Sequence, residues 1–100
     1  MAISLTDLSY DEAQDPIAAN MDFQLKLSLF GATDDVPATV KFWTPEAYAV
    51  VPAAVNVTIP SGQTEFDKLV TVQLRGTAQP GLVRIYAECD ERHSVFVEVR

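Results

Sequence analysis

Few residues in this chain have side chains that could carry out chemistry. Its 100 residues include one histidine, His93, and one cysteine, Cys89. His93 has no Cys or His at metal-ligand spacing and no companions for a Ser-His-Asp set, so we interpret it as a solvated loop residue in the turn 90–93. Cys89 closes an apolar alternation and is interpreted as a small buried hydrophobe. The four glycines form no phosphate-binding loop. The sequence therefore predicts no catalytic residues and no cofactor, and we expect the chain not to be an enzyme.

Carboxylates are the other chemically capable groups. The loops of a sandwich alternate between its two ends, which places Asp34–Asp35 and Asp90–Glu91 at the same end, near Ser61. Three or more carboxylates at one loop tip could bind calcium through oxygen ligands. No EF-hand spacing is present, so we favour a solvated acidic tip over a calcium site and predict no bound metal.

Strands must position these residues, because the dominant signal is alternation of apolar and polar residues at period two. Seven segments show it: 3–8, 21–29, 39–42, 55–59, 70–74, 83–89 and 95–99. Proline and glycine turns separate them. Segment 45–54 could hold a helical turn or a short edge strand around Tyr48 and Val50. We predict an all-β fold, an immunoglobulin-like antiparallel β-sandwich of about seven strands, as a single domain over residues 1–100.

The inward-facing residues of these strands should form a core between two sheets. In segment 21–29 the apolar set begins at Met21 and continues through every second residue to Leu29. With one cysteine there is no intrachain disulfide, so the core alone must hold the domain. We expect the following side chains to be buried: Phe23, Leu25, Leu27, Val40, Phe42, Val57, Val72, Val83, Ile85, Val95 and Val97.

The charge of the chain argues against two classes of partner. Fourteen acidic residues face seven basic ones, which gives a formal net charge of -7. Nucleic acid binding needs clustered Lys and Arg, and anionic membrane surfaces would repel this chain. No stretch approaches the ~18 apolar residues of a membrane span. The start, MAISLTDLSYDE, lacks a basic segment followed by a long apolar run, so we expect neither membrane insertion nor a signal peptide.

Segment 51–64, VPAAVNVTIPSGQT, carries a likeness to a known family. It resembles a stretch of the bacterial immunoglobulin-like repeat domains of large surface and secreted proteins. The resemblance continues through segments 70–72 and 80–87 and closes on strand 95–99. It implies a spacer, adhesive or display module without an active site. Because bacteriophage particles also display immunoglobulin-like domains, it further implies a place on a virion or at the cell surface.

One outer face of the predicted sandwich carries candidate binding residues. The third, sixth and seventh strands of an immunoglobulin-like fold share a sheet. If their core residues point inward, Lys41, Trp43, Arg84, Tyr86 and Phe96 lie on the opposite face, together with Glu88 and Glu98. Trp, Tyr and Arg are the residues most enriched at binding hot spots, and soluble monomers seldom expose such a patch. The alternative is that aromatics merely suit strands and that Trp43 folds over an edge of the core.

Two functions are compatible with this face. The first is a non-catalytic structural module that assembles with itself or decorates a larger particle, so that its partner is protein. The second is a carbohydrate- or receptor-binding adhesive module, in which exposed aromatics stack on the sugar rings of a surface glycan. An assembly module needs a large apolar face, whereas a sugar binder needs an aromatic platform flanked by amides and carboxylates. The sequence shows the apolar face more clearly, which favours the first function.

Overall fold

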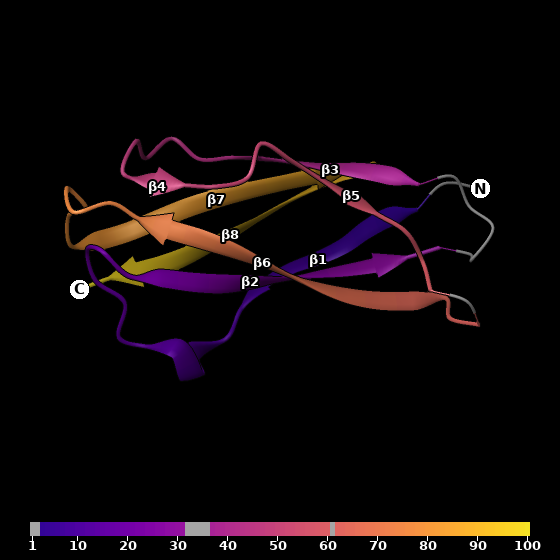
Figure 1. Cartoon of the computed structure of the whole chain (residues 1–100), viewed down its shortest axis with the longest axis horizontal. Helices are drawn as coiled ribbons and strands as arrows, with labels where there is room; N and C mark the ends of the chain where they lie inside the picture. Colours follow the sequence, from indigo (N-terminus) through magenta and orange to yellow (C-terminus); the bar gives the residue numbers. More distant parts are fainter. Residues whose placement is uncertain (1–2, 32–36, 61) are drawn as a thin grey trace.

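The protein is a sandwich of two antiparallel four-stranded sheets (Figure 1). The computed structural model describes residues 3–31, 37–60 and 62–100. One sheet has the strand order β1-β2-β6-β4 and the other the order β5-β3-β7-β8. The strands are β1 (Ser4–Tyr10), β2 (Asp22–Phe30), β3 (Ala38–Trp43), β4 (Ala49–Val50), β5 (Ala54–Val57), β6 (Glu65–Leu74), β7 (Gly81–Cys89) and β8 (Glu91–Val99), and a short 3-10 helix, η1 (Glu12–Gln14), follows β1. The predicted all-β sandwich is confirmed, and segment 45–54 adds the short edge strand β4.

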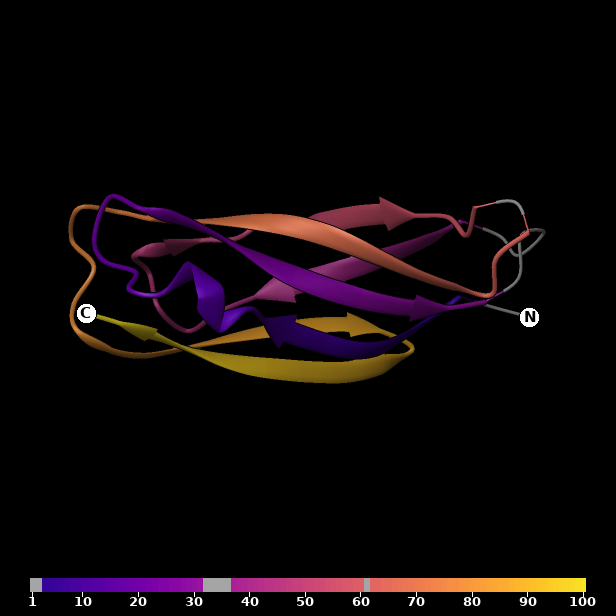
Figure 2. The same ribbon diagram turned by 90° about the horizontal axis from the view of Figure 1, so that it is seen from below.

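Each sheet of the sandwich contains one long pair of antiparallel strands. β2 pairs with β6 along its whole length, from Asp22 opposite Gln73 to Phe30 opposite Glu65. β7 and β8 form a hairpin that turns at Asp90, whose φ of 70° lies in the left-handed region that aspartate tolerates better than most residues. Figure 2 shows β2 running alongside β6 and β1, its two neighbours in the sheet, and β4 extends this sheet beyond the end of β6.

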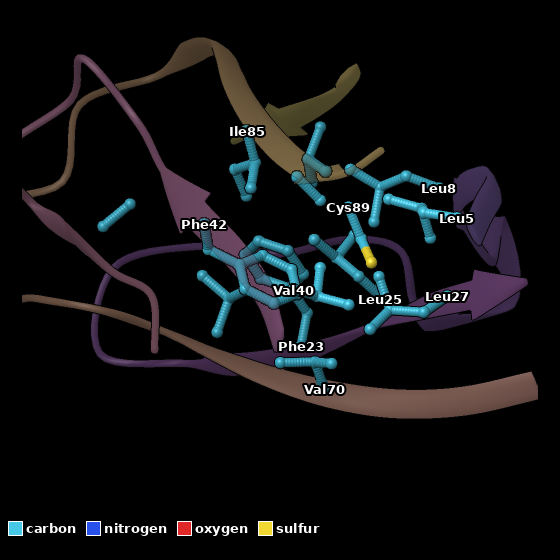
Figure 3. Close-up of a cluster of buried hydrophobic side chains, with 14 of the residues drawn as sticks. Leu5, Leu8, Phe23, Leu25, Leu27, Val40, Phe42, Val70, Ile85 and Cys89 are labelled. Atoms are coloured by element: carbon cyan, nitrogen blue, oxygen red, sulfur yellow. The ribbon is translucent and has the colours of Figure 1, made fainter. Parts of the chain in front are cut away.

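The core lies between the sheets and is built from the predicted alternation. Side chains from both layers meet there, for example Leu25 and Leu27 from β2 and Val40 and Ile85 from the other sheet (Figure 3). All the residues predicted to be buried are buried except Val95, which is half-buried because β8 is the outermost strand of its sheet. Met21 is a second correction, because β2 begins only at Asp22 and the Met21 side chain is exposed.

The margin formed by β1 and β8 is closed by polar contacts, and here the structure corrects the interpretation of His93. The predicted loop 90–93 is a tight turn at Asp90, and His93 lies within β8 with a partly buried side chain. Its Nε2 lies 2.9 Å from the Leu5 carbonyl oxygen, which can only accept, so this nitrogen carries the proton. Farther along, the backbone N–H of Arg100 donates to the Ile17 carbonyl over 2.8 Å. His93 therefore joins the two sheets instead of facing solvent.

Cys89 has the buried position expected for a small hydrophobe. It belongs to the core cluster, and its Sγ lies 3.6 Å from the Ile3 carbonyl oxygen. Burial raises the pKa of the thiol, and the negative charge of Asp90 raises it further.

Because the thiolate is the reactive form, native Cys89 should react with an aromatic disulfide reagent far more slowly than it does in denaturant. The measurement is the rate of thiolate release at mildly alkaline pH, with and without urea. Equal rates in the two conditions would show that the end of β7 opens freely and would contradict the buried placement.

Candidate interaction face

The five predicted interaction residues lie together on the outer face of the second sheet. Cross-strand register places Trp43 of β3 opposite Tyr86 of β7, and Arg84 of β7 opposite Phe96 of β8. Lys41 lies opposite Glu88, which in turn lies opposite Arg92. Their shared orientation follows from the strand period of two, because their neighbours in sequence fill the core.

The aromatic and cationic side chains of this face contact one another in series. The rings of Trp43 and Tyr86 are stacked, with centroids 5.4 Å apart and planes within 7° of parallel. The Arg84 guanidinium lies 4.2 Å from the centroid of the Phe96 ring and 5.7 Å from that of Tyr86. The Arg92 guanidinium lies 5.2 Å from the centroid of the Trp43 ring. We call these residues, Lys41, Trp43, Arg84, Tyr86, Arg92 and Phe96, the aromatic face.

Arg84 occupies the centre of the aromatic face and is held in place from several directions. Its Nη1 donates a hydrogen bond to the Tyr86 hydroxyl over 3.1 Å, and its backbone carbonyl accepts one from the Thr44 hydroxyl over 2.7 Å. Its Nε is buried, and within the described part of the chain it has no hydrogen-bond partner.

The sequence prediction missed some members of this face. The sequence places Arg92 in the turn 90–93, yet β8 begins at Glu91 and places Arg92 beside Glu88, with Arg92 Nε 3.2 Å from Glu88 Oε2. Leu82 also lies on this face, at the start of β7, and is 61% exposed. Extending the even-numbered positions of β8 back from Phe96 would have found Arg92. The alternative placement of Trp43 over an edge of the core is not observed, since Trp43 is exposed and lies outside the core cluster.

The structure describes only part of the predicted acidic tip. Asp34, Asp35 and Ser61 of the predicted acidic tip lie outside the described residues. Within residues 3–31, 37–60 and 62–100, no group of three or more His, Cys, Asp or Glu side chains is arranged to hold a metal ion. In the same residues no helix has the length and apolar character needed to cross a membrane.

A shallow hollow lies on the first sheet, beside Tyr10 and Lys26. Tyr10 lies at its rim, and its hydroxyl donates to Asp15 Oδ1 over 2.7 Å. Burial raises the pKa of Tyr10 well above its ordinary value of 10.0, and the hydrogen bond to Asp15 and the nearby negative charges add to this effect. The folded state thus retains a proton that the unfolded state releases near pH 10.

Stability should therefore be complete below about pH 10 and should fall as pH rises above it, since the native state then binds more protons than the unfolded state. Tyr10→Phe should flatten this decline, because phenylalanine does not titrate. The measurement is urea unfolding of both proteins at pH values below and above 10. Parallel curves for the two proteins would exclude Tyr10 as the cause.

Comparison with known proteins adds no identification. No family model, no curated protein and no solved structure matches the chain.

Proposed function

We propose that the chain is a non-catalytic interaction module that binds protein through the aromatic face, assembling with itself or decorating a larger particle. The observation that carries this proposal is the unbroken series of contacts from Arg92 through Trp43, Tyr86 and Arg84 to Phe96. Display on a virion or at a cell surface, as the family resemblance implies, suits such a module.

The contacts within the aromatic face favour binding for a thermodynamic reason. Association must immobilise interface side chains, at a cost of about 0.5–1.5 kcal/mol for each rotamer-rich one. The stacked rings of Trp43 and Tyr86, and the hydrogen bond from Arg84 to Tyr86, already hold these side chains in the free protein. Trp43 and Phe96 nonetheless remain 36% and 50% exposed, so a partner has apolar surface left to bury.

The same contacts disfavour the carbohydrate alternative. A sugar ring binds by stacking on a free aromatic face. Here the Trp43 ring already stacks on Tyr86, and a guanidinium lies close to the Phe96 ring. The cations beside these rings suit a protein partner with carboxylates around an apolar centre.

The variant that tests the proposal combines Trp43→Ala with Tyr86→Ala. We expect it to stay folded, because the pair lies outside the core cluster, and to lose about 1 kcal/mol of stability from aromatic stacking in addition to the contribution of the buried part of the two rings. Its association with itself or with a partner should weaken at least about tenfold, as expected for hot-spot residues. Thermal melting measures the first effect and sedimentation velocity the second. An unfolded double variant would assign these side chains a structural role, and unchanged association would place the partner site elsewhere.

Photo-crosslinking gives a second readout that does not depend on the identity of the partner. Phe96→benzoylphenylalanine places a photoreactive group on the aromatic face, and Gln79→benzoylphenylalanine places the same group on the exposed loop before β7. We expect protein adducts, identified by mass spectrometry after irradiation of the producing cells, from position 96 and not from position 79. Equal labelling from both positions would contradict a specific site.

A further inference from the structure

The outer face of the first sheet is acidic. Exposed residues of β1, β2 and β6 form it, and register places their side chains on one surface. Its charged members are the carboxylates Asp7, Asp22, Glu65 and Asp67 and one lysine, Lys26. Four carboxylates against one cation give this surface, the acidic face, a formal charge of -3.

The aromatic face has the opposite sign. The outer surface of its sheet carries Lys41, Arg84 and Arg92 against Glu88 and Glu98, which gives +1 in a chain whose formal net charge is -7. The two faces belong to the two different sheets of the sandwich (Figure 1), so each lies on the side of its sheet away from the core. The molecule is therefore polarised across its thickness.

Both faces also expose large apolar side chains. Phe30 and Leu69 are 44% and 60% exposed on the acidic face. On the other side, Leu82 and Phe96 are exposed beside the cations of the aromatic face. Each face thus combines exposed apolar side chains with a net charge, and the sign of that net charge differs between the two faces.

We propose that the partner of the aromatic face is the acidic face of a second copy of this chain, an inference that rests on the proposed function. Pairing two aromatic faces would bring together two surfaces of the same positive net charge, and like charges at an interface disfavour association. Pairing unlike faces brings carboxylates to cations and buries the apolar side chains of both. Such a contact is heterologous: after two copies pair, one still has a free acidic face and the other a free aromatic face, so assembly grows into a ring or a filament.

Salt provides the first test of the inference. Raising ionic strength from about 0.1 M to about 1 M shortens the Debye length from about 10 Å to about 3 Å. The average mass of the wild-type protein, measured by light scattering over a wide concentration range, should rise with concentration and fall with added salt. A mass that grows equally at both salt concentrations would contradict attraction between the charged faces.

Two complementary variants give the decisive test. Phe96→Glu introduces a carboxylate into the aromatic face, and Leu69→Lys replaces an apolar residue of the acidic face with a cation. Each protein alone should remain monomeric, because one of its two faces no longer binds. An equal mixture should form a dimer and stop there, because Leu69→Lys keeps an intact aromatic face and Phe96→Glu keeps an intact acidic face. The controls Gln63→Glu and Gln79→Lys make the same charge changes in exposed loops and should assemble like the wild type.

The outcomes separate this inference from the proposed function. If Phe96→Glu is monomeric while Leu69→Lys assembles normally, the aromatic face binds its like, and only the heterologous pairing is wrong. If the wild type is monomeric at every concentration, the pairing of two copies is wrong. The proposed function is then tested separately by the protein adducts formed by crosslinking from position 96. If Phe96→Glu assembles like the wild type, both proposals are wrong.

Discussion

Truncation of Ile85 to alanine is expected to lower the free energy of unfolding by about 2–5 kcal/mol, the range for deleting a buried aliphatic side chain. Ile85 has no exposed surface and lies on β7, which pairs with strands on both sides. Leu27 is equally buried on the core side of the other sheet, where β2 lies between β1 and β6. Leu27→Ala should therefore have a similar effect. A loss of this size is a large part of the 5–15 kcal/mol that typically stabilises a small domain.

Leu82→Ala is the matched control for Ile85→Ala. Leu82 belongs to the same strand but lies on its outer face and is 61% exposed, so its truncation should change stability by no more than about 0.5 kcal/mol. Urea unfolding of the three variants and the wild type gives the comparison. If Ile85→Ala and Leu82→Ala were equally stable, the inward and outward phases of β7 would be assigned wrongly.

The sequence was sufficient to predict which residues of a strand point into the core and which point outward wherever one face of the strand is uniformly apolar. In β2 and β7 every second residue is apolar and buried, so the period of two determines both the strand and its orientation. The five residues of the predicted interaction face followed from the same parity, since each lies one position from a core residue. Their location on one outer surface followed from the inward positions of Val40, Val83 and Val97 together with the expectation that these three strands share a sheet.

The alternation fails where charged or polar residues occupy inward positions. β6 begins at Glu65, five residues before its predicted start. The prediction began too late because Lys68 occupies an inward position, where it interrupts the series of apolar residues. β8 also begins earlier than predicted, at Glu91. The prediction missed its first residues because the polar His93 occupies an inward position, where it bonds to the backbone of β1. The stacking of Trp43 on Tyr86 could not be derived from parity, since it depends on which residues lie opposite each other across two strands distant in sequence.

Lys68 also protects an open strand edge. β4 pairs only with the last two residues of β6, so the preceding part of β6 has no strand beyond it within the described residues. The N–H of Leu74 donates toward β2, to the Met21 carbonyl, whereas that of Arg75 donates toward β4, to the Tyr48 carbonyl. Because these directions alternate along a strand, the N–H groups of Glu65, Asp67, Leu69 and Thr71 point to the open edge. Such an edge invites pairing with another chain unless a charge prevents it.

Lys68→Val should therefore cause aggregation without loss of native stability. Register places Lys68 opposite Leu27 on the inward side of β6, with its side chain partly buried, so a strand added at this edge would desolvate its charge. Valine removes this penalty and raises the β-propensity of the strand. The measurement is light scattering during prolonged incubation, together with thermal melting. Arg75→Val, which removes the same charge from an exposed residue just beyond the end of β6 and outside both the acidic and the aromatic face, is the control and should scatter no more than the wild type. Equal scattering from both variants would show that loss of charge causes the aggregation, and that Lys68 does not guard the β6 edge.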